Sequence, residues 1–132
     1  MAKFESEQVI LQAPCEEVFD FLSDFRNLES LMPEQITNWQ ATKDNCSFTI
    51  QGVADLSMEV ASRSVGRNIH IVSSGGNPVA YSLDYFFRNK NGSCEVSVLL
   101  EADLNPFLKS IASRPLQSLV SVIAGKLKEL YA

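Results

Sequence analysis

The sequence predicts an α+β fold in which a curved antiparallel sheet surrounds a long C-terminal helix. Through most of residues 35–103, apolar residues alternate with polar ones at a period of two, and short turns separate the alternating segments. An apolar stripe at helical spacing then runs from Leu108 to Leu130. Each predicted strand has one apolar face that needs a cover, and only the C-terminal helix is long enough to supply it.

The composition is that of an ordinary globular chain of 132 residues, so we expect residues 1–132 to form a single domain. Sixteen acidic residues against eleven basic ones give a net charge of −5, which disfavours nucleic acid and anionic membrane surfaces as partners. No signal peptide is apparent, and no apolar run reaches the roughly 18 residues of a membrane span. We therefore predict a soluble, cytoplasmic protein without stable membrane insertion.

The three cysteines, Cys15, Cys46 and Cys94, are odd in number and far apart, and none belongs to a C-x-x-C motif. This pattern predicts neither a disulfide framework nor a zinc site, and it fits a reduced cytoplasmic protein. Cys15 lies at a predicted helix N-terminus, where the helix dipole favours a thiolate. No histidine is near it in sequence to act as a base, so we expect a structural or incidental cysteine.

His70 is the only histidine, and its neighbours Ile69 and Ile71 are in the apolar phase of a predicted strand. The imidazole should therefore point outward, away from the core. Without a second histidine or a convergent set of carboxylates, the sequence predicts no catalytic residue, no metal site and no cofactor.

The N-terminal third predicts a strand followed by two short helices. The β-branched pair Val9-Ile10 favours a strand over residues 4–11. Pro14 suits the first position of a helix whose apolar stripe continues to Met32, where Pro33 stops it. Asp24 and Asn27 predict a break within this stretch. The matching residues of the stripe are Val18, Phe21, Leu22, Phe25, Leu28 and Met32.

The remaining strands are predicted from their alternation. One starts at Trp39, and the others cover residues 46–51, 56–61, 68–73, 81–88 and 96–101, with turns at 75–78 and 89–92. Asn105 can cap the last helix and Pro106 can begin it. Pro115 lies inside that helix, so we expect a bend or break near Ser113.

Residues 13–33, APCEEVFDFLSDFRNLESLMP, resemble the opening of the START-like, or SRPBCC, helix-grip superfamily, and the order of elements agrees along the whole chain. The resemblance implies about seven strands around the C-terminal helix, with a ligand cavity between them. Such proteins bind lipids, sterols, polyketides or quinones, and some are cyclases or hydrolases. The polyketide cyclase/dehydrase-like branch is the most similar in length. Its catalytic residues share no motif, so none is carried over. The matching residues are Ala13, Pro14, Glu16, Val18, Phe19, Leu22, Asp24, Asn27, Leu28, Leu31 and Pro33.

Tyr81 and Tyr85 are the strongest candidates for ligand contact, since both hydroxyls should project from the concave face of the sheet. The strand phases also bring Ser6, Gln8 and Ser62 toward that face. The predicted cavity wall comprises Leu28, Met32, Ile50, Met58, Val60, Ile71, Tyr81, Leu83, Tyr85, Leu108, Ile111, Ala112, Leu116 and Leu119.

Three hypotheses about function follow. The favoured one is a non-catalytic protein that binds or carries a small hydrophobic molecule (a lipid, polyketide or quinone-like compound) in a cavity above roughly 300 Å³. The second is a polyketide cyclase/dehydrase-like enzyme, which requires a carboxylate or His70 beside Tyr81 or Tyr85. The third is a homodimeric interaction module with a vestigial cavity, for which Trp39 and Phe86 on the outer face would be the anchors.

Overall fold

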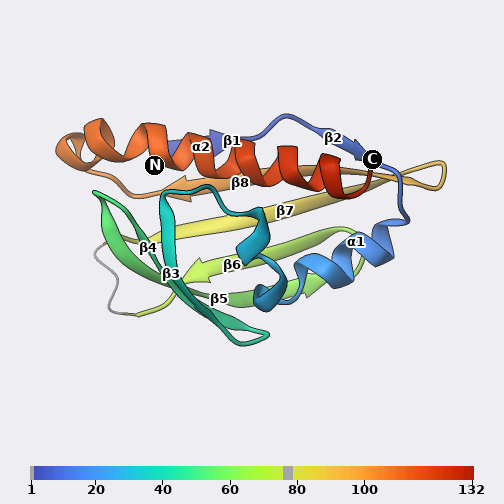
Figure 1. Ribbon diagram of the computed structural model, residues 1–132, viewed down its shortest axis with the longest axis horizontal. Coiled ribbons are helices and arrows are strands. Elements are labelled where there is room, and N and C mark those ends of the chain that lie inside the picture. The colour runs from blue at the N-terminus through green and yellow to red at the C-terminus, as the bar shows by residue number, and fades with distance from the viewer. Residues whose placement is uncertain (1, 76–78) are drawn as a thin grey trace.

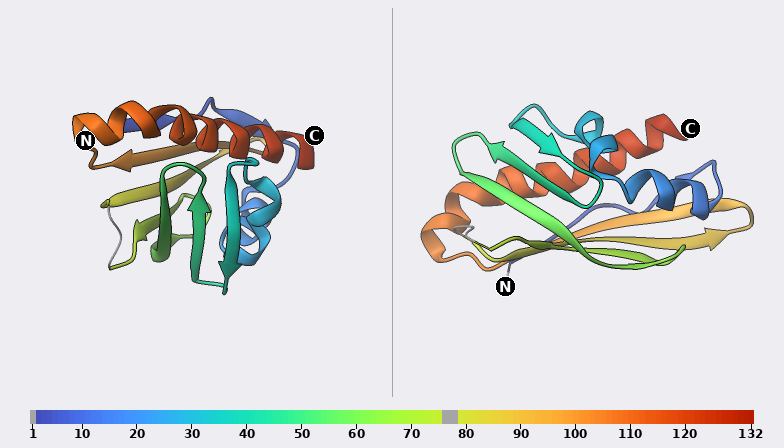
Figure 2. Two further views of the ribbon diagram at one scale, coloured as in Figure 1. Left: turned by 60° about the vertical axis from the view of Figure 1, so that its left-hand side comes forward. Right: turned by 90° about the horizontal axis from the view of Figure 1, so that it is seen from below.

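The computed structural model describes residues 2–75 and 79–132, which form an antiparallel sheet curved around one long helix (Figures 1 and 2). The predicted α+β helix-grip architecture is confirmed. Its elements are β1 (Ala2–Glu5), β2 (Val9–Leu11), α1 (Cys15–Leu22), the 3-10 helices η1 (Phe25–Asn27) and η2 (Glu29–Leu31), β3 (Ile36–Ala41), β4 (Asn45–Ile50), β5 (Ala54–Ser64), β6 (Asn68–Ser73), β7 (Tyr81–Lys90), β8 (Ser93–Ala102) and α2 (Pro106–Leu130).

The sheet order is β1-β8-β7-β6-β5-β4-β3, and β2 pairs with β8 beside β1. β1 and β2 therefore share one edge position, which gives the seven positions predicted. The sequence predicts one strand over residues 4–11, but Ser6 interrupts it. The backbone N–H of Val98 donates to the hydroxyl of Ser6, and the backbone N–H of Ser6 donates to the carbonyl of Val98. At the far end of β7, the predicted hairpin turn places Asn91 and Gly92 at φ 51° and 90°.

The N-terminal helices close one end of the curved sheet (Figure 1). Pro14 caps α1, which begins at Cys15, one residue later than predicted. The predicted break occurs at Asp24, whose carboxylate accepts a hydrogen bond from the Arg26 amide and so caps η1. The same carboxylate pairs with the Arg26 guanidinium at 2.6 Å, which lowers the pKa of Asp24 to about 2.

Helix α2 runs unbroken through Pro115, so of the bend or break predicted near Ser113 the break is wrong. The missing amide of Pro115 would have paired with the carbonyl of Ile111, a residue that is 40% exposed. Water can therefore solvate that carbonyl, while buried Ala112 and Leu116 hold the helix against the sheet on either side of the proline. No helix among the described residues has both the length and the apolar character needed to cross a membrane.

Two β-bulges change which side chains face the core. Between Thr37 and Gln40, β3 has one more residue than β4 opposite, and Asn38 takes a positive φ of 55°. The bulge turns Trp39 inward, so the predicted outward position of Trp39 is wrong. A second bulge in β5 places Ser62 opposite His70 on the outer face, and Ser62 does not join the concave face as predicted.

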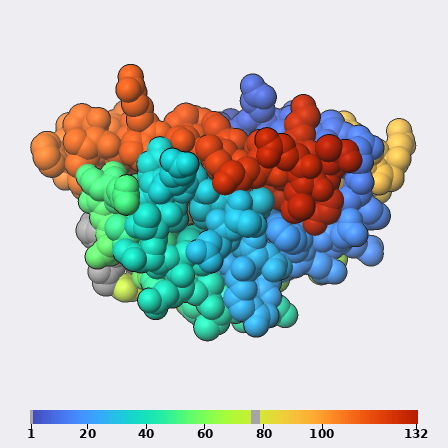
Figure 3. Space-filling model, in the orientation of Figure 1, coloured from blue at the N-terminus to red at the C-terminus, as the bar shows by residue number. Residues whose placement is uncertain are grey.

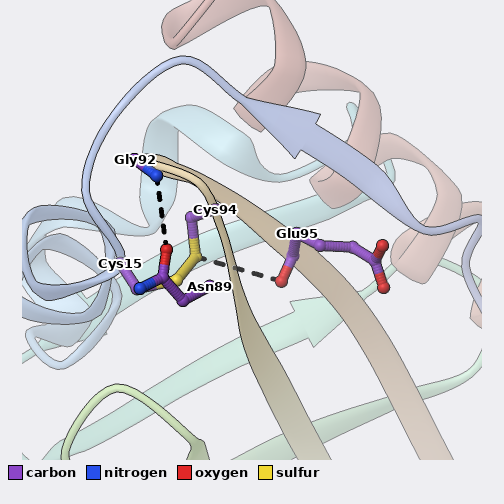
Figure 4. Close-up of a disulfide and its surroundings, with 5 residues drawn as sticks. All are labelled: Cys15, Asn89, Gly92, Cys94 and Glu95. Atoms are coloured by element: carbon purple, nitrogen blue, oxygen red, sulfur yellow. Dashed lines mark hydrogen bonds between the residues drawn. A yellow bond between two sulfur atoms is a disulfide. The ribbon is translucent and has the colours of Figure 1, made fainter.

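Cys15 and Cys94 form a disulfide, which contradicts the predicted absence of one (Figure 4). The bond joins the first residue of α1 to the start of β8, with a Cα–Cα distance of 4.9 Å. Sequence spacing could not show this pairing, because 79 positions separate the two cysteines. The pairing of β2 with β8, which sets Leu11 opposite Cys94, brings them together. Cys46 is the free cysteine, and it is buried in the core.

Candidate functional site

A small apolar cavity lies between α2 and the concave face of the sheet. Among the residues that the structure describes, no polar atom is exposed on its wall, which strands β3, β4, β5, β7 and β8 share with α2. Seven of the predicted lining residues line it: Met32, Met58, Tyr81, Leu83, Ala112, Leu116 and Leu119. The sequence analysis missed Trp39, Phe48, Val53, Ala54, Leu56, Val79, Leu100, Ala102, Leu104 and Ile123. Phe48, Leu56 and Leu100 alternate inward on predicted strands like the residues that were chosen, so the strand pattern alone could have included these three.

The other predicted lining residues lie elsewhere in the fold. Four of them are fully buried in the hydrophobic core but do not border the cavity: Leu28, Ile50, Ile71 and Tyr85. Val60 and Leu108 are half-buried. Ile111 is exposed, and none of the first six residues of α2, 106–111, has a buried side chain. In Figure 3 the start of α2 forms the orange projection at one end of the molecule.

The cavity has a volume of about 40 Å³ in this conformation. That is room for about one water molecule, and far below the roughly 300 Å³ of a typical small-molecule site. The interior is therefore nearly filled by its own side chains. A ligand larger than a few atoms must displace part of the wall.

Two methionines make part of that wall adaptable. Met32 follows η2, and Met58 lies on β5 opposite Cys46. An unbranched thioether side chain changes rotamer at low cost, so methionine tolerates a change in cavity shape better than leucine or phenylalanine. These two side chains are therefore the parts of the wall that adapt most readily to a bound molecule.

Trp39 is the largest side chain on the wall. Its ring stacks on Phe48 with centroids 5.4 Å apart, and its Nε1–H donates to the Phe25 carbonyl at 3.2 Å. This hydrogen bond ties β3 to η1 and fixes the indole orientation. Because the chain contains a single tryptophan, the emission of Trp39 is a direct probe of the cavity.

The two predicted tyrosines differ in their hydrogen bonds. The Tyr81 hydroxyl donates to the Ser57 carbonyl at 2.7 Å, so its polar end is satisfied by the sheet. The Tyr85 hydroxyl is buried without a hydrogen-bond partner among the described residues. Burial raises the pKa of both tyrosines, and the neighbouring Cys46 adds to the effect. Burial also raises the pKa of the Cys46 thiol to about 12, so this thiol stays protonated and unreactive.

His70 points to the outer face of the sheet, as predicted. Its Nδ1 lies 2.8 Å from Oδ1 of Asp84, a carboxylate that also accepts from Asn68 Nδ2 at 3.2 Å. No histidine or carboxylate among the described residues lines the cavity, so the requirement of the cyclase hypothesis is not met there. Within residues 2–75 and 79–132, no three His, Cys, Asp or Glu side chains converge as a metal site would require.

Comparison with solved structures supports the same architecture. A conserved protein from Geobacillus kaustophilus matches with a TM-score of 0.73 at 15% identity, covering 98% of this chain and 95% of that one. A protein from Thermus thermophilus matches with a TM-score of 0.72 at 13% identity over 97% and 95% of the two chains. Norcoclaurine synthase from Thalictrum flavum matches with a TM-score of 0.68 at 12% identity over 98% and 85%.

This chain has the helix-grip fold. The resemblance noted for residues 13–33 is thereby confirmed at the level of the fold. No family model matches the sequence, and no curated protein matches it either. At such low sequence identity, structural similarity shows only the fold, so the ligand has to be inferred from the site itself.

Proposed function

We propose that this protein binds a small, uncharged hydrophobic molecule between α2 and the sheet. The observation that carries the proposal is the cavity wall, which is entirely apolar and is built from five strands and the long helix. Pockets for apolar ligands have such walls, with few polar groups. The predicted classes of ligand, a lipid, a polyketide or a quinone-like compound, remain within this proposal.

The cavity must enlarge for a ligand to enter. The start of α2 is the segment best placed to move, because residues 106–111 bury no side chain and Phe107 is 71% exposed. Elements with few buried contacts open at low free-energy cost. Pro115 favours the same movement, since it removes one helical hydrogen bond between these turns and the anchored part of the helix. Hydrogen exchange should therefore be faster for the amides of residues 107–111 than for those of 119–127.

Trp39 allows a direct test with a neutral probe. N-phenyl-1-naphthylamine bound in the cavity should accept energy from Trp39, so its emission should rise and saturate when the indole is excited. Ala112→Leu fills the cavity from α2 and should weaken binding at least tenfold. Gly125→Leu adds the same side chain elsewhere on the same helix, where no heavy atom lies within 4 Å of the position that a Cβ would take, and should bind like the wild type.

Energy transfer that does not saturate, or that Ala112→Leu leaves unchanged, would refute binding in the cavity. Native mass spectrometry of the protein purified from its own host is the complementary search for a natural ligand. The homodimer hypothesis has less support, because Trp39 faces the cavity and leaves Phe86, which is 42% exposed, as the remaining proposed anchor.

The cytoplasmic location stays a prediction and has lost one of its supports. It rested partly on three reduced cysteines, whereas Cys15 and Cys94 form a disulfide. Such bonds persist mainly in oxidising compartments. Free-thiol labelling of protein taken directly from its host would show whether the bond is formed there.

A further inference from the structure

The Tyr85 hydroxyl has no role in the packing described above. Its side chain is completely buried, yet the oxygen has no hydrogen-bond partner among the described residues. Within the same part of the chain, the Ser23 hydroxyl is the other buried side-chain group in this condition. Buried hydroxyls in native structures nearly always have a partner, so an unpartnered one calls for an explanation.

Tyr85 lies directly beyond the cavity on the inner face of β7. Tyr81, Leu83 and Tyr85 alternate inward along this strand, and the first two line the cavity. Tyr85 is the next inward position, about 7 Å further along the strand. Its neighbours across β6 and β8, Ile69 and Val98, are apolar and offer no side-chain partner.

Met58 pairs with Ser73 of β6, whose hydroxyl accepts from the Tyr81 amide, so Met58 lies at the Tyr81 end of the inward row of β7. Met58 is the cross-strand neighbour of Cys46, so both side chains point to the same inner face. Leu83 is the wall residue next to Tyr85 on this row, so displacement of the Leu83 side chain opens the cavity toward Tyr85.

We propose that the Tyr85 hydroxyl is the polar anchor of the site and donates a hydrogen bond to a carbonyl oxygen of an otherwise apolar ligand. The inference rests on the proposed function and adds the chemical class of the ligand. A carbonyl fits because it only accepts hydrogen bonds and brings no further donor into an apolar wall. Carboxylates and amines are excluded, since no charged side chain among the described residues lines the cavity to replace their lost hydration.

Acetophenone and α-methylstyrene form a suitable probe pair, because they have nearly the same shape and differ in a C=O group against a C=CH₂ group. Methyl-¹³C-methionine labelling gives direct signals from the cavity, since Met32 and Met58 line it. Both probes should shift these two signals, and the titrations yield both dissociation constants. Because shape and apolar contacts contribute almost equally to the binding of both probes, their effect largely cancels in the ratio of the two dissociation constants.

Tyr85→Phe should weaken binding of the ketone relative to the alkene about 5- to 10-fold, which is the factor expected for the loss of one neutral hydrogen bond. The alkene should bind this variant as well as the wild type, because only an unpartnered oxygen is removed. Tyr131→Phe removes a phenolic hydroxyl outside the cavity wall and should leave the ratio unchanged. The methionine spectrum of each free variant verifies that it is folded.

The outcomes separate the two proposals. If both probes bind and Tyr85→Phe leaves their ratio unchanged, the anchor is refuted while binding in the cavity stands. If neither probe shifts the Met32 and Met58 signals, and N-phenyl-1-naphthylamine also fails to bind, the proposed function is refuted and the anchor with it.

Discussion

Removing the disulfide is expected to destabilise the protein more than any other single change considered above. The Cys15–Cys94 bond closes a loop across 79 sequence positions. For a loop of about 80 residues, the chain-entropy relation gives about 15 cal/mol/K, or about 4.5 kcal/mol at 25 °C. That is a large share of the roughly 5–15 kcal/mol by which a typical domain is stable. The physical reason is that the bond restricts the unfolded chain, which otherwise gains freedom when α1 separates from β8.

The test compares urea unfolding of the oxidised wild type with that of the Cys15→Ala/Cys94→Ala double variant. With a slope of about 1.5 kcal/mol per M, a loss of about 4.5 kcal/mol lowers the unfolding midpoint by about 3 M. Cys46→Ala is the matched control, because it removes a buried thiol without opening a loop, and it should cost about 1–2 kcal/mol. A double variant no less stable than this control, or free-thiol labelling of Cys15 and Cys94 in the wild type, would refute the reasoning.

Three further predictions concern single residues. Pro115→Ala should restore a helical hydrogen bond and stabilise α2 by about 1–3 kcal/mol, measured by urea unfolding; a loss of stability would contradict this. Tyr81→Phe should cost about 0.5–1.5 kcal/mol because it removes the hydrogen bond from the Tyr81 hydroxyl to the Ser57 carbonyl, which still accepts from the Ser74 amide, whereas Tyr85→Phe should be neutral or stabilising; equal costs would contradict the two environments described. Asp24 has a folded-state pKa of about 2, below its ordinary 3.8, so its pairing with Arg26 stabilises the fold above pH 3.8 and is lost as the pH falls toward 2. Asp24→Asn should therefore be less stable than the wild type at about pH 7, by under about 1 kcal/mol, and equal to it near about pH 1.5, as followed by thermal unfolding.

Alternation of apolar and polar residues is local information, and it predicted the strands well where the chain is regular. β6 was predicted with its observed bounds, and the inward row Tyr81, Leu83 and Tyr85 on β7 was correctly phased. The prediction of phase failed at the bulges, because one extra residue reverses every side chain beyond it and leaves no clear mark in composition. Trp39 was placed on the wrong face for this reason.

Predictions about the site failed where they depended on distance through space. Half of the predicted wall lines the cavity, since burial on the inner face does not show which buried residues border an open volume. The same limit applies to the cysteines, whose pairing depends on how β2 pairs with β8 rather than on their spacing.

Local patterning by itself determined the α+β class, the order of elements, the outward position of His70 and the long C-terminal helix that the sheet surrounds. These features follow from periodicity and capping, which act over a few residues. Only the tertiary structure decided the disulfide, the cavity of about 40 Å³ and the unpaired hydroxyl of Tyr85. Each of these depends on how side chains from distant segments fill a shared interior, and close packing makes that outcome sensitive to every neighbour at once.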